Sequence, residues 1–250
     1  MNLAGLPAFV PDWHLPAGVK ALQTECGRGP QPYGGFNLGD HVGDDIAHVA
    51  SNRQALVDAA GVAPIWMTQV HGTHVLALNE PSAVSPEADA VMTQTPGIAC
   101  AIMTADCLPV LVADKQARVV GAAHAGWRGL AAGVVEQLIN AMILVPGVTH
   151  QDLTVWLGPA IGPTAFEVGQ DVVDAFVNRN AQNATCFRLH PIAKGKYLAD
   201  LPALAVNRLR AQGIKDITLS GLCTYTLRDR FYSYRRDPVT GRMASLIWLE

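Results

Sequence analysis

The chain has 250 residues, half of them apolar, and a formal net charge of −3 at pH 7. This length and apolar content suffice for a sizeable core, and we expect one domain over residues 1–250. The slightly acidic balance argues against nucleic acid or an anionic membrane surface as a partner. No run of eighteen apolar residues is present, so no membrane-spanning helix is expected.

The N-terminal residues and the cysteines indicate where the protein resides. Prolines and an aspartate interrupt the first twenty residues, which lack a basic start, so we expect no signal peptide. The five cysteines are scattered, odd in number and without a C-x-x-C pair, which fits a reducing compartment. We therefore expect a cytoplasmic protein, as a monomer or a weak oligomer.

A stretch rich in glycine and aspartate, Tyr33–Asp45, precedes a helical pattern at Ile46–Ala60, with Asp44 or Asp45 as the N-cap. A glycine-rich approach to a helix N-terminus can bind an anion, although most such loops are only turns. Further along, Pro64–Leu78 is predicted to form two strands separated at Gly72. His71 would lie at that break, where a ligand or catalytic residue is well exposed.

Two apolar runs, 110–113 and 119–123, flank a short polar segment and predict a β-hairpin. In an antiparallel pair, the numbers of facing residues share one sum. If the turn is centred on the 115–116 peptide bond, Cys107 faces His124, with Cβ atoms ~4.5–5.5 Å apart. No Asn-Gly or Asp-Gly pair sets this turn, so the register is a hypothesis.

A thiolate and an imidazole at that distance can bind one tetrahedral zinc ion. The alternative is equally open at this point, because a free cysteine is usually a small buried apolar side chain. The setting favours chemistry, since the two residues end their strands beside Asp106, Trp127 and Arg128.

The rest of the sequence contains both strand and helix patterns. Strand candidates outnumber helix candidates and several adjoin as hairpins, so we predict an α+β layered sheet rather than a doubly wound one. The last segment, Phe231–Leu249, is predicted to be a hairpin, with Arg235, Arg236 and Arg242 near its turn. Three arginines there could bind a phosphate or carboxylate, and a solvated turn is the alternative. The other predicted elements are strands at Ala88–Thr93, Ile98–Thr104, Leu153–Gly158 and Ile217–Ser220 and helices at Leu130–Leu144, Gly169–Arg179 and Leu201–Gln212.

Common nucleotide-binding, zinc-protease and hydrolase motifs are missing from the sequence, as is the H-x-E with P-C-x-x-C signature of zinc deaminases. Five other motifs occur in order instead: QVHG (69–72), TADCLP (104–109), HAGWRG (124–129), GPAIGP (158–163) and YRRDPVTGRMAS (234–245). Together with FNLGDHVGDD and the later NR at 52–53, they resemble the bacterial YfiH or laccase-domain family. Its members have been called polyphenol oxidases and, later, purine nucleoside enzymes.

The resemblance implies a layered α-β-β-α sandwich and a zinc site formed by His71, Cys107 and His124. It also implies phosphorolysis of adenosine, inosine and methylthioadenosine, together with adenosine deamination. The partners would then be a small nucleoside and phosphate. Three protein ligands with an open fourth position are typical of a catalytic zinc, which can activate water for attack at purine C6. Cu²⁺ could replace zinc there.

Candidate roles follow for the other residues near these motifs. Asp106 would polarise a ligand or take part in proton transfer, completing a catalytic set with His71, Cys107 and His124. The residues expected to bind phosphate or other parts of the substrate are Asn37, Gly39, Arg53, Gln69, Arg128 and Arg235.

Three other functions remain open from the sequence. A copper oxidase could use the same two histidines and cysteine, but a trinuclear oxygen-reducing cluster needs more histidines than the eight in this chain can gather. A thiol hydrolase would use Cys107 as nucleophile with His124 or His71 as base. A binding module without catalysis is the last alternative.

Overall fold

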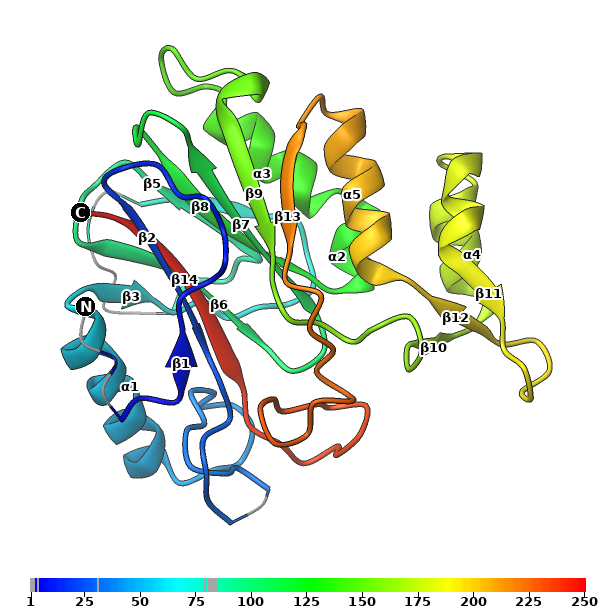
Figure 1. Ribbon diagram of the computed structural model, residues 1–250, viewed down its shortest axis with the longest axis horizontal. Helices are drawn as coiled ribbons and strands as arrows, with labels where there is room; N and C mark the ends of the chain where they lie inside the picture. Colours follow the sequence, from blue (N-terminus) through cyan, green and yellow to red (C-terminus); the bar gives the residue numbers. More distant parts are fainter. Residues whose placement is uncertain (1–2, 4, 31, 79, 81–84) are drawn as a thin grey trace.

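The protein is an α+β structure in which two main sheets pack face to face with helices on both outer surfaces (Figure 1). The computed structural model describes residues 3, 5–30, 32–78, 80 and 85–250. The predicted fold class is confirmed. No helix among the described residues is long and apolar enough to cross a membrane.

The first sheet has five strands, in the order β1 (Ala8–Phe9), β2 (Val19–Thr24), β14 (Met243–Leu249), β6 (Ile98–Thr104) and β3 (Ala63–Ile65). Helix α1 (Ile46–Ala60) packs on its outer face and has the predicted bounds. Its N-cap is Asp45, whose carboxylate accepts from the Ala47 amide, and it ends at Gly61 in the left-handed conformation. Because the Asp45 carboxylate occupies the helix N-terminus, the structure favours the turn interpretation of this glycine-rich loop over an anion site.

The second sheet has six strands, in the order β13 (Asp216–Leu219), β9 (Leu153–Leu157), β7 (Leu108–Asp114), β8 (Val120–Ala125), β5 (Ala90–Thr93) and β4 (Val75–Ala77). Its outer face is covered by α2 (Trp127–Ala132), α3 (Val134–Met142) and α5 (Leu201–Ala211). The single helix predicted over Leu130–Leu144 is thus divided, because Gly133 has a φ of 110°. Gly121 lets α3 approach closely, since a Cβ there would lie 2.9 Å from Leu138 Cδ1.

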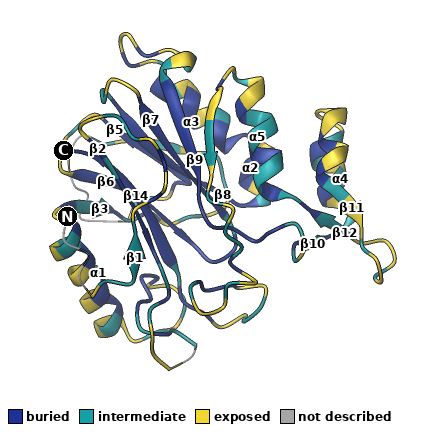
Figure 2. Ribbon diagram, in the orientation of Figure 1, coloured by how far each residue is buried: buried dark blue, intermediate teal, exposed yellow. Residues whose placement is uncertain are grey.

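A layer of buried apolar side chains joins the two sheets, with Ile102 and Ile247 from one sheet packed with Leu111 and Trp156 from the other. Figure 2 shows that the central strands are buried while the exposed residues gather on helices and loops. A third sheet of β10 (Glu167–Val168), β12 (Tyr197–Ala199) and β11 (Phe187–Leu189) extends to one side with α4 (Gln170–Val177) and a 3-10 helix (Ala181–Cys186) (Figure 1). A further short 3-10 helix, His150–Asp152, precedes β9.

The hairpin of β7 and β8 forms, but its register differs from the predicted one. His124 faces Pro109, so Cys107 lies two residues from the predicted position opposite His124. The turn is shifted because the Asp114 carboxylate accepts hydrogen bonds from the backbone amide and the guanidinium of Arg118. The shift is even, so Cys107 and His124 stay on the same side of the hairpin.

The predicted C-terminal hairpin is wrong. Strand β14 pairs with β2 and β6, and the segment before it is an irregular loop. Phe231 and Tyr232 are buried in a small cluster of their own. The Arg236 guanidinium donates to the carbonyls of Thr224, Tyr225 and Phe231 and so holds this loop together.

Candidate metal centre and its pocket

Two histidines and a cysteine that are distant in the sequence converge on one point. The ligand atoms of His71, Cys107 and His124 all lie within 4.8 Å of one another, and Cys107 Sγ is 3.7 Å from His71 Nε2. Ligand atoms on one tetrahedral zinc lie about 3.3–3.6 Å apart, given bonds of ~2.3 Å to sulfur and ~2.0–2.1 Å to nitrogen. These three residues could therefore hold a metal ion after small side-chain adjustments. The predicted convergence is confirmed.

A buried carboxylate that the sequence analysis missed, Asp89, supports the ring of His124. Asp89 Oδ1 lies 2.8 Å from His124 Nδ1, and both side chains are almost inaccessible to solvent. A carboxylate beside Nδ1 keeps the proton on that nitrogen and leaves Nε2 free for a metal. The same arrangement raises the basicity of the ligand nitrogen.

The same carboxylate also holds the loop that carries His71. The backbone amides of Val70, His71 and Gly72 donate to the two oxygens of Asp89, over 3.2, 2.9 and 2.6 Å. His71 itself has a φ of 62°, an uncommon conformation for a residue other than glycine. Asp89 thus fixes the positions of two of the three ligands. The signal in the sequence was a single carboxylate directly before a buried strand.

Gly126, the N-cap of α2, allows the ligands to come this close. A Cβ atom at this position would lie 2.6 Å from His71 Cδ2 and 3.0 Å from Cys107 Sγ. The glycine two residues after His124 in the HAGWRG motif is therefore required by the cluster itself.

The charges in the cluster favour the thiolate that a metal needs. Burial opposes ionisation of Cys107, yet His124 and His71 lower the pKa of its thiol to about 6. Burial likewise disfavours the charged imidazole, but the Cys107 thiolate and the Asp89 carboxylate raise the pKa of His124 to about 9. A metal cation between the three ligands would stabilise the thiolate in place of the protonated imidazoles.

The cluster forms part of the wall of a cavity of about 520 Å³, large enough for a drug-sized ligand. His71 is exposed, Cys107 is half-buried and His124 is 4% exposed, so one side of the cluster is open to solvent. The lining residues are His41, Gln69, His71, Met103, Thr104, Ala105, Asp106, Cys107, His124, Trp127, Arg128, Ile161, Phe166, Tyr234, Arg235 and Arg242.

Arg242, one of the three arginines near the predicted C-terminal turn, also lines this cavity. Its guanidinium donates to the carbonyls of Thr240 and Gly241, and its backbone amide donates to Asn37. A Cβ on Gly39 would lie 2.8 Å from Arg242 Cγ, so this glycine allows the arginine side chain to pack against the loop.

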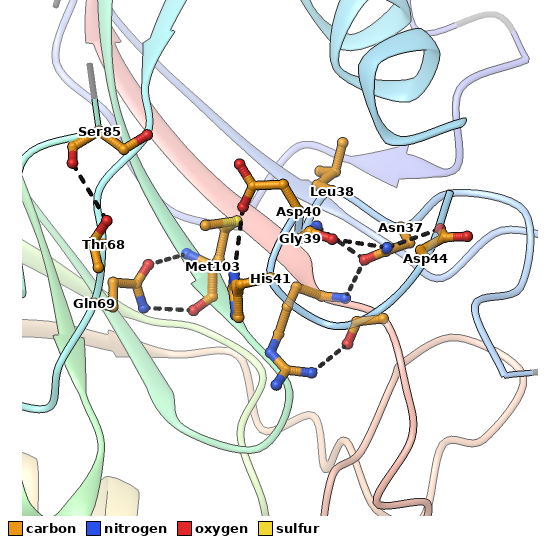
Figure 3. Close-up of polar contacts among 12 residues, drawn as sticks. Asn37, Leu38, Gly39, Asp40, His41, Asp44, Thr68, Gln69, Ser85 and Met103 are labelled. Atoms are coloured by element: carbon orange, nitrogen blue, oxygen red, sulfur yellow. Dashed lines mark hydrogen bonds and ion pairs between the residues drawn. The ribbon is translucent and has the colours of Figure 1, made fainter. Parts of the chain in front are cut away.

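The loop at residues 37–44 supports that arginine through Asn37, whose contacts with Gly39 and Asp44 are drawn in Figure 3. The Asn37 side chain donates to Gly39 and Asp44 and accepts from Gly39 and Arg242. Neither Asn37 nor Gly39 lines the cavity, whereas His41 of the same loop does. Direct substrate contact, predicted for Asn37 and Gly39, is therefore not supported by the geometry.

Arg53 and Gln69 have their polar groups bonded within the protein. Arg53 donates to the Leu38 carbonyl, forms an ion pair with Asp40 at 3.2 Å and does not line the cavity. The Gln69 amide donates to and accepts from the backbone of Met103, both at 2.8 Å (Figure 3). Gln69 does line the cavity, and these bonds tie the QVHG segment to the end of β6.

Asp106 lines the cavity, yet both oxygens of its carboxylate accept protein hydrogen bonds. The donors are Thr224 Oγ1 at 2.6 Å, Ser233 Oγ at 3.0 Å and the backbone amide of Arg235 at 2.7 Å. Asp106 has a φ of 97° and precedes Cys107 directly. These contacts favour a positioning role over the proton transfer predicted for it.

The predicted arginine clamp is divided between two places. Arg235 lines the cavity, with its guanidinium on the Glu167 carbonyl and 5.6 Å from the Phe166 ring. Arg236 instead binds the loop backbone described above. Arg128 also lines the cavity, and its guanidinium lies 4.5 Å from the ring of Trp127.

Known proteins resemble this chain over nearly its whole length. A family described as multi-copper polyphenol oxidoreductase laccase matches residues 21–250. The purine nucleoside phosphorylase YfiH of Escherichia coli is 46% identical over 96% of this chain and 98% of its own. A purine nucleoside phosphorylase of Haemophilus influenzae is 45% identical over 98% of this chain and all of its own.

Solved structures also resemble this chain over nearly its whole length. The crystal structure of protein NMB0706 of Neisseria meningitidis superposes with a TM-score of 0.90 at 45% identity, covering 98% of this chain and 99% of that one. The hypothetical protein YfiH of Bacillus licheniformis superposes with a TM-score of 0.86 at 30% identity, covering 93% of each chain.

Proposed function

Since the chain belongs to the family described as multi-copper polyphenol oxidoreductase laccase, with curated relatives named purine nucleoside phosphorylases, we propose that it is a zinc-dependent purine nucleoside phosphorylase. The proposed substrates are adenosine, inosine and methylthioadenosine. Adenosine deamination is proposed as a second activity of the same pocket.

One observation carries the proposal. The His71, Cys107 and His124 ligand atoms lie at the wall of a cavity that also contains arginine side chains and aromatic rings. Three protein ligands with one open side are typical of a catalytic zinc site, and a thiolate with two imidazoles suits zinc. A zinc ion bound there would supply a Lewis acid at the edge of the pocket.

The pocket residues can be assigned to parts of the reaction. In phosphorolysis an orthophosphate oxygen bonds to C1′, the C1′–N9 bond breaks, and the purine leaves with the electron pair and takes up a proton. Arg242, beside the cluster, would bind the orthophosphate through its free guanidinium nitrogens. The exposed ring of Tyr234 at the cavity wall offers a surface on which the purine can stack.

The direct test is metal analysis of the purified protein beside an assay of adenosine with phosphate. Adenine with ribose 1-phosphate indicates phosphorolysis, and inosine or hypoxanthine indicates deamination. We expect about one zinc per chain and the phosphorolysis products. Zinc-loaded protein that releases neither adenine nor hypoxanthine would refute the proposal.

A thiol hydrolase is a second candidate, favoured by the low pKa of Cys107 beside two imidazoles. Alkylation separates the two functions. In a Cys223→Ser background, Cys107 is the only cysteine that is not buried. We expect iodoacetamide to modify zinc-loaded protein at least about 10-fold more slowly than chelator-treated protein, because a metal-bound thiolate is protected. Equal rates, with an acyl group trapped on Cys107, would support the hydrolase instead.

A copper oxidase receives less support. Among the described residues, His71, Cys107 and His124 are the one group of three or more side chains able to hold an ion. A trinuclear oxygen-reducing cluster needs more histidines than this site contains. Copper binding is instead expected as replacement of zinc, since Cu²⁺ binds such sites more tightly. Phenol oxidation by copper-free, zinc-loaded protein would contradict this view.

We further propose that the protein is cytoplasmic and a monomer or weak oligomer with small-molecule partners only. Light scattering should give a mass near 26.6 kDa at low concentration. A stable dimer at micromolar concentration, or recovery of the protein outside the cytoplasm, would contradict this.

A further inference from the structure

The cavity contains more unpaired positive charge than a neutral nucleoside and one orthophosphate require. Arg128, Arg235 and Arg242 all line it, and in the part of the chain that the structure describes none of them forms an ion pair with a carboxylate. Asp106 is the single carboxylate among the lining residues, and its oxygens already accept three protein hydrogen bonds. Unpaired guanidinium groups around a cavity are suited to a strongly anionic ligand.

The three guanidinium groups have separate supports. Arg242 is bonded to the carbonyls of Thr240 and Gly241 on the side of the metal cluster. The Arg235 guanidinium donates to the carbonyl of Glu167, which belongs to the small third sheet, and lies 5.6 Å from the ring of Phe166. Arg128 lies over Trp127 at the start of α2. Orthophosphate bound by Arg242 therefore leaves two arginines without an anionic partner.

The polar atoms of those two arginines are largely free. Arg235 uses one guanidinium nitrogen for Glu167, and no hydrogen bond of the Arg128 side chain occurs among the described residues. Both side chains are exposed to the cavity solvent. At about 520 Å³, the cavity lies within the ~300–1,000 Å³ range of pockets for drug-sized ligands, which suits a nucleotide with orthophosphate beside it.

We propose that the pocket accepts purine nucleosides that carry a phosphate at the 5′ position, with Arg128 and Arg235 binding that phosphate and Arg242 binding the orthophosphate. This substrate class rests on the proposed function. The reaction balances as before: the orthophosphate oxygen bonds to C1′, the C1′–N9 bond breaks, and the purine takes the electron pair and a proton. The second product is ribose 1,5-bisphosphate.

Calorimetric titration of the zinc-loaded protein tests the proposal by affinity rather than by turnover. Adenosine 5′-monophosphate should bind at least about 10-fold more tightly than adenosine at low salt, and this advantage should shrink at high salt. Saturating inorganic phosphate should leave the advantage in place, because the two phosphates occupy different sites. Equal affinities for the two ligands would overturn the proposal, as would direct competition between orthophosphate and the 5′-phosphate.

Arg128→Gln and Arg235→Gln identify the side chains involved. Each variant should weaken adenosine 5′-monophosphate about 10-fold, leave adenosine within about 2-fold and keep the zinc content unchanged. Arg210→Gln, on the exposed part of α5, is the matched control and should change neither affinity. Equal weakening of both ligands would show that the arginines contact the base or ribose, and would overturn the proposal. Wild-type protein that binds the nucleotide preferentially but phosphorolyses no nucleoside would refute the proposed function alone.

Discussion

Replacing Cys107 with serine is expected to weaken zinc binding and to lower kcat/KM by at least about 100-fold each. A serine hydroxyl stays protonated at neutral pH and cannot replace the thiolate, whose pKa of about 6 reflects the two neighbouring imidazoles. Changes in residues that only support a zinc ligand cost 10–100-fold, so loss of a ligand should cost at least as much. Competition with a chromophoric chelator measures the affinity, and adenosine phosphorolysis measures the rate.

Cys223→Ser is the matched control for that variant. Cys223 is also half-buried and accepts a hydrogen bond from the Gly162 amide, which a serine oxygen can accept too. It does not line the cavity, so its replacement should leave zinc content and rate within about 2-fold. Full zinc occupancy and turnover in Cys107→Ser would show that the chemistry lies elsewhere.

Replacing Asp89 with asparagine is expected to lower both zinc affinity and folding stability. The carboxylate accepts from His124 Nδ1 and from three successive amides at 70–72, and none of these donors can be satisfied by an amide NH₂ group. We expect a 10–100-fold loss of zinc affinity. The free energy of unfolding should fall by about 3 kcal/mol, because a buried, hydrogen-bonded charge is removed.

The effects of this variant are separated by two measurements. Urea unfolding of the metal-free protein gives the stability, and chelator competition at low denaturant gives the zinc affinity. Glu87→Gln, an exposed carboxylate two residues earlier, should leave both quantities unchanged. Wild-type zinc affinity in Asp89→Asn would mean that the carboxylate does not orient His124 as described.

Local patterns were sufficient to predict the elements whose causes are local. The helix Ile46–Ala60 was predicted with correct bounds because an N-cap aspartate and a following glycine mark its ends. The helix predicted from Leu130 was wrong at Gly133, where an apolar stripe continues across a break. The apolar stripe continues because α2 and α3 both pack on the same face of the sheet. The left-handed backbone of Gly133 nevertheless ends one helix and begins the next.

Features set by distant residues could not be read from local patterns. The register of β7 and β8 depends on Asp114 binding Arg118, which no turn signal revealed. The hairpin predicted from Phe231 failed because β14 pairs with β2 and β6, both more than a hundred residues earlier in the chain. Asp89 was missed since it joins two ligand segments through the fold alone.

The same distinction holds for the candidate site. His71, Cys107 and His124 could be named from the motifs, and their ligand atoms do converge. Because the register of β7 and β8 is shifted by an even number of residues, Cys107 and His124 still lie on the same face of the hairpin. Arg242 could not be distinguished from Arg235 and Arg236 by the sequence, because which arginine of a cluster enters a cavity depends on how the loop packs.

The most direct test of the central claim is zinc K-edge X-ray absorption of the protein as purified. One sulfur at about 2.3 Å and two imidazole nitrogens at about 2.0–2.1 Å, with one lighter ligand from solvent or phosphate, are expected from Cys107, His71 and His124. The sulfur contribution should vanish in Cys107→Ser. A shell of nitrogen and oxygen alone in the wild-type protein, or protein that retains no metal while turning over adenosine, would contradict the account.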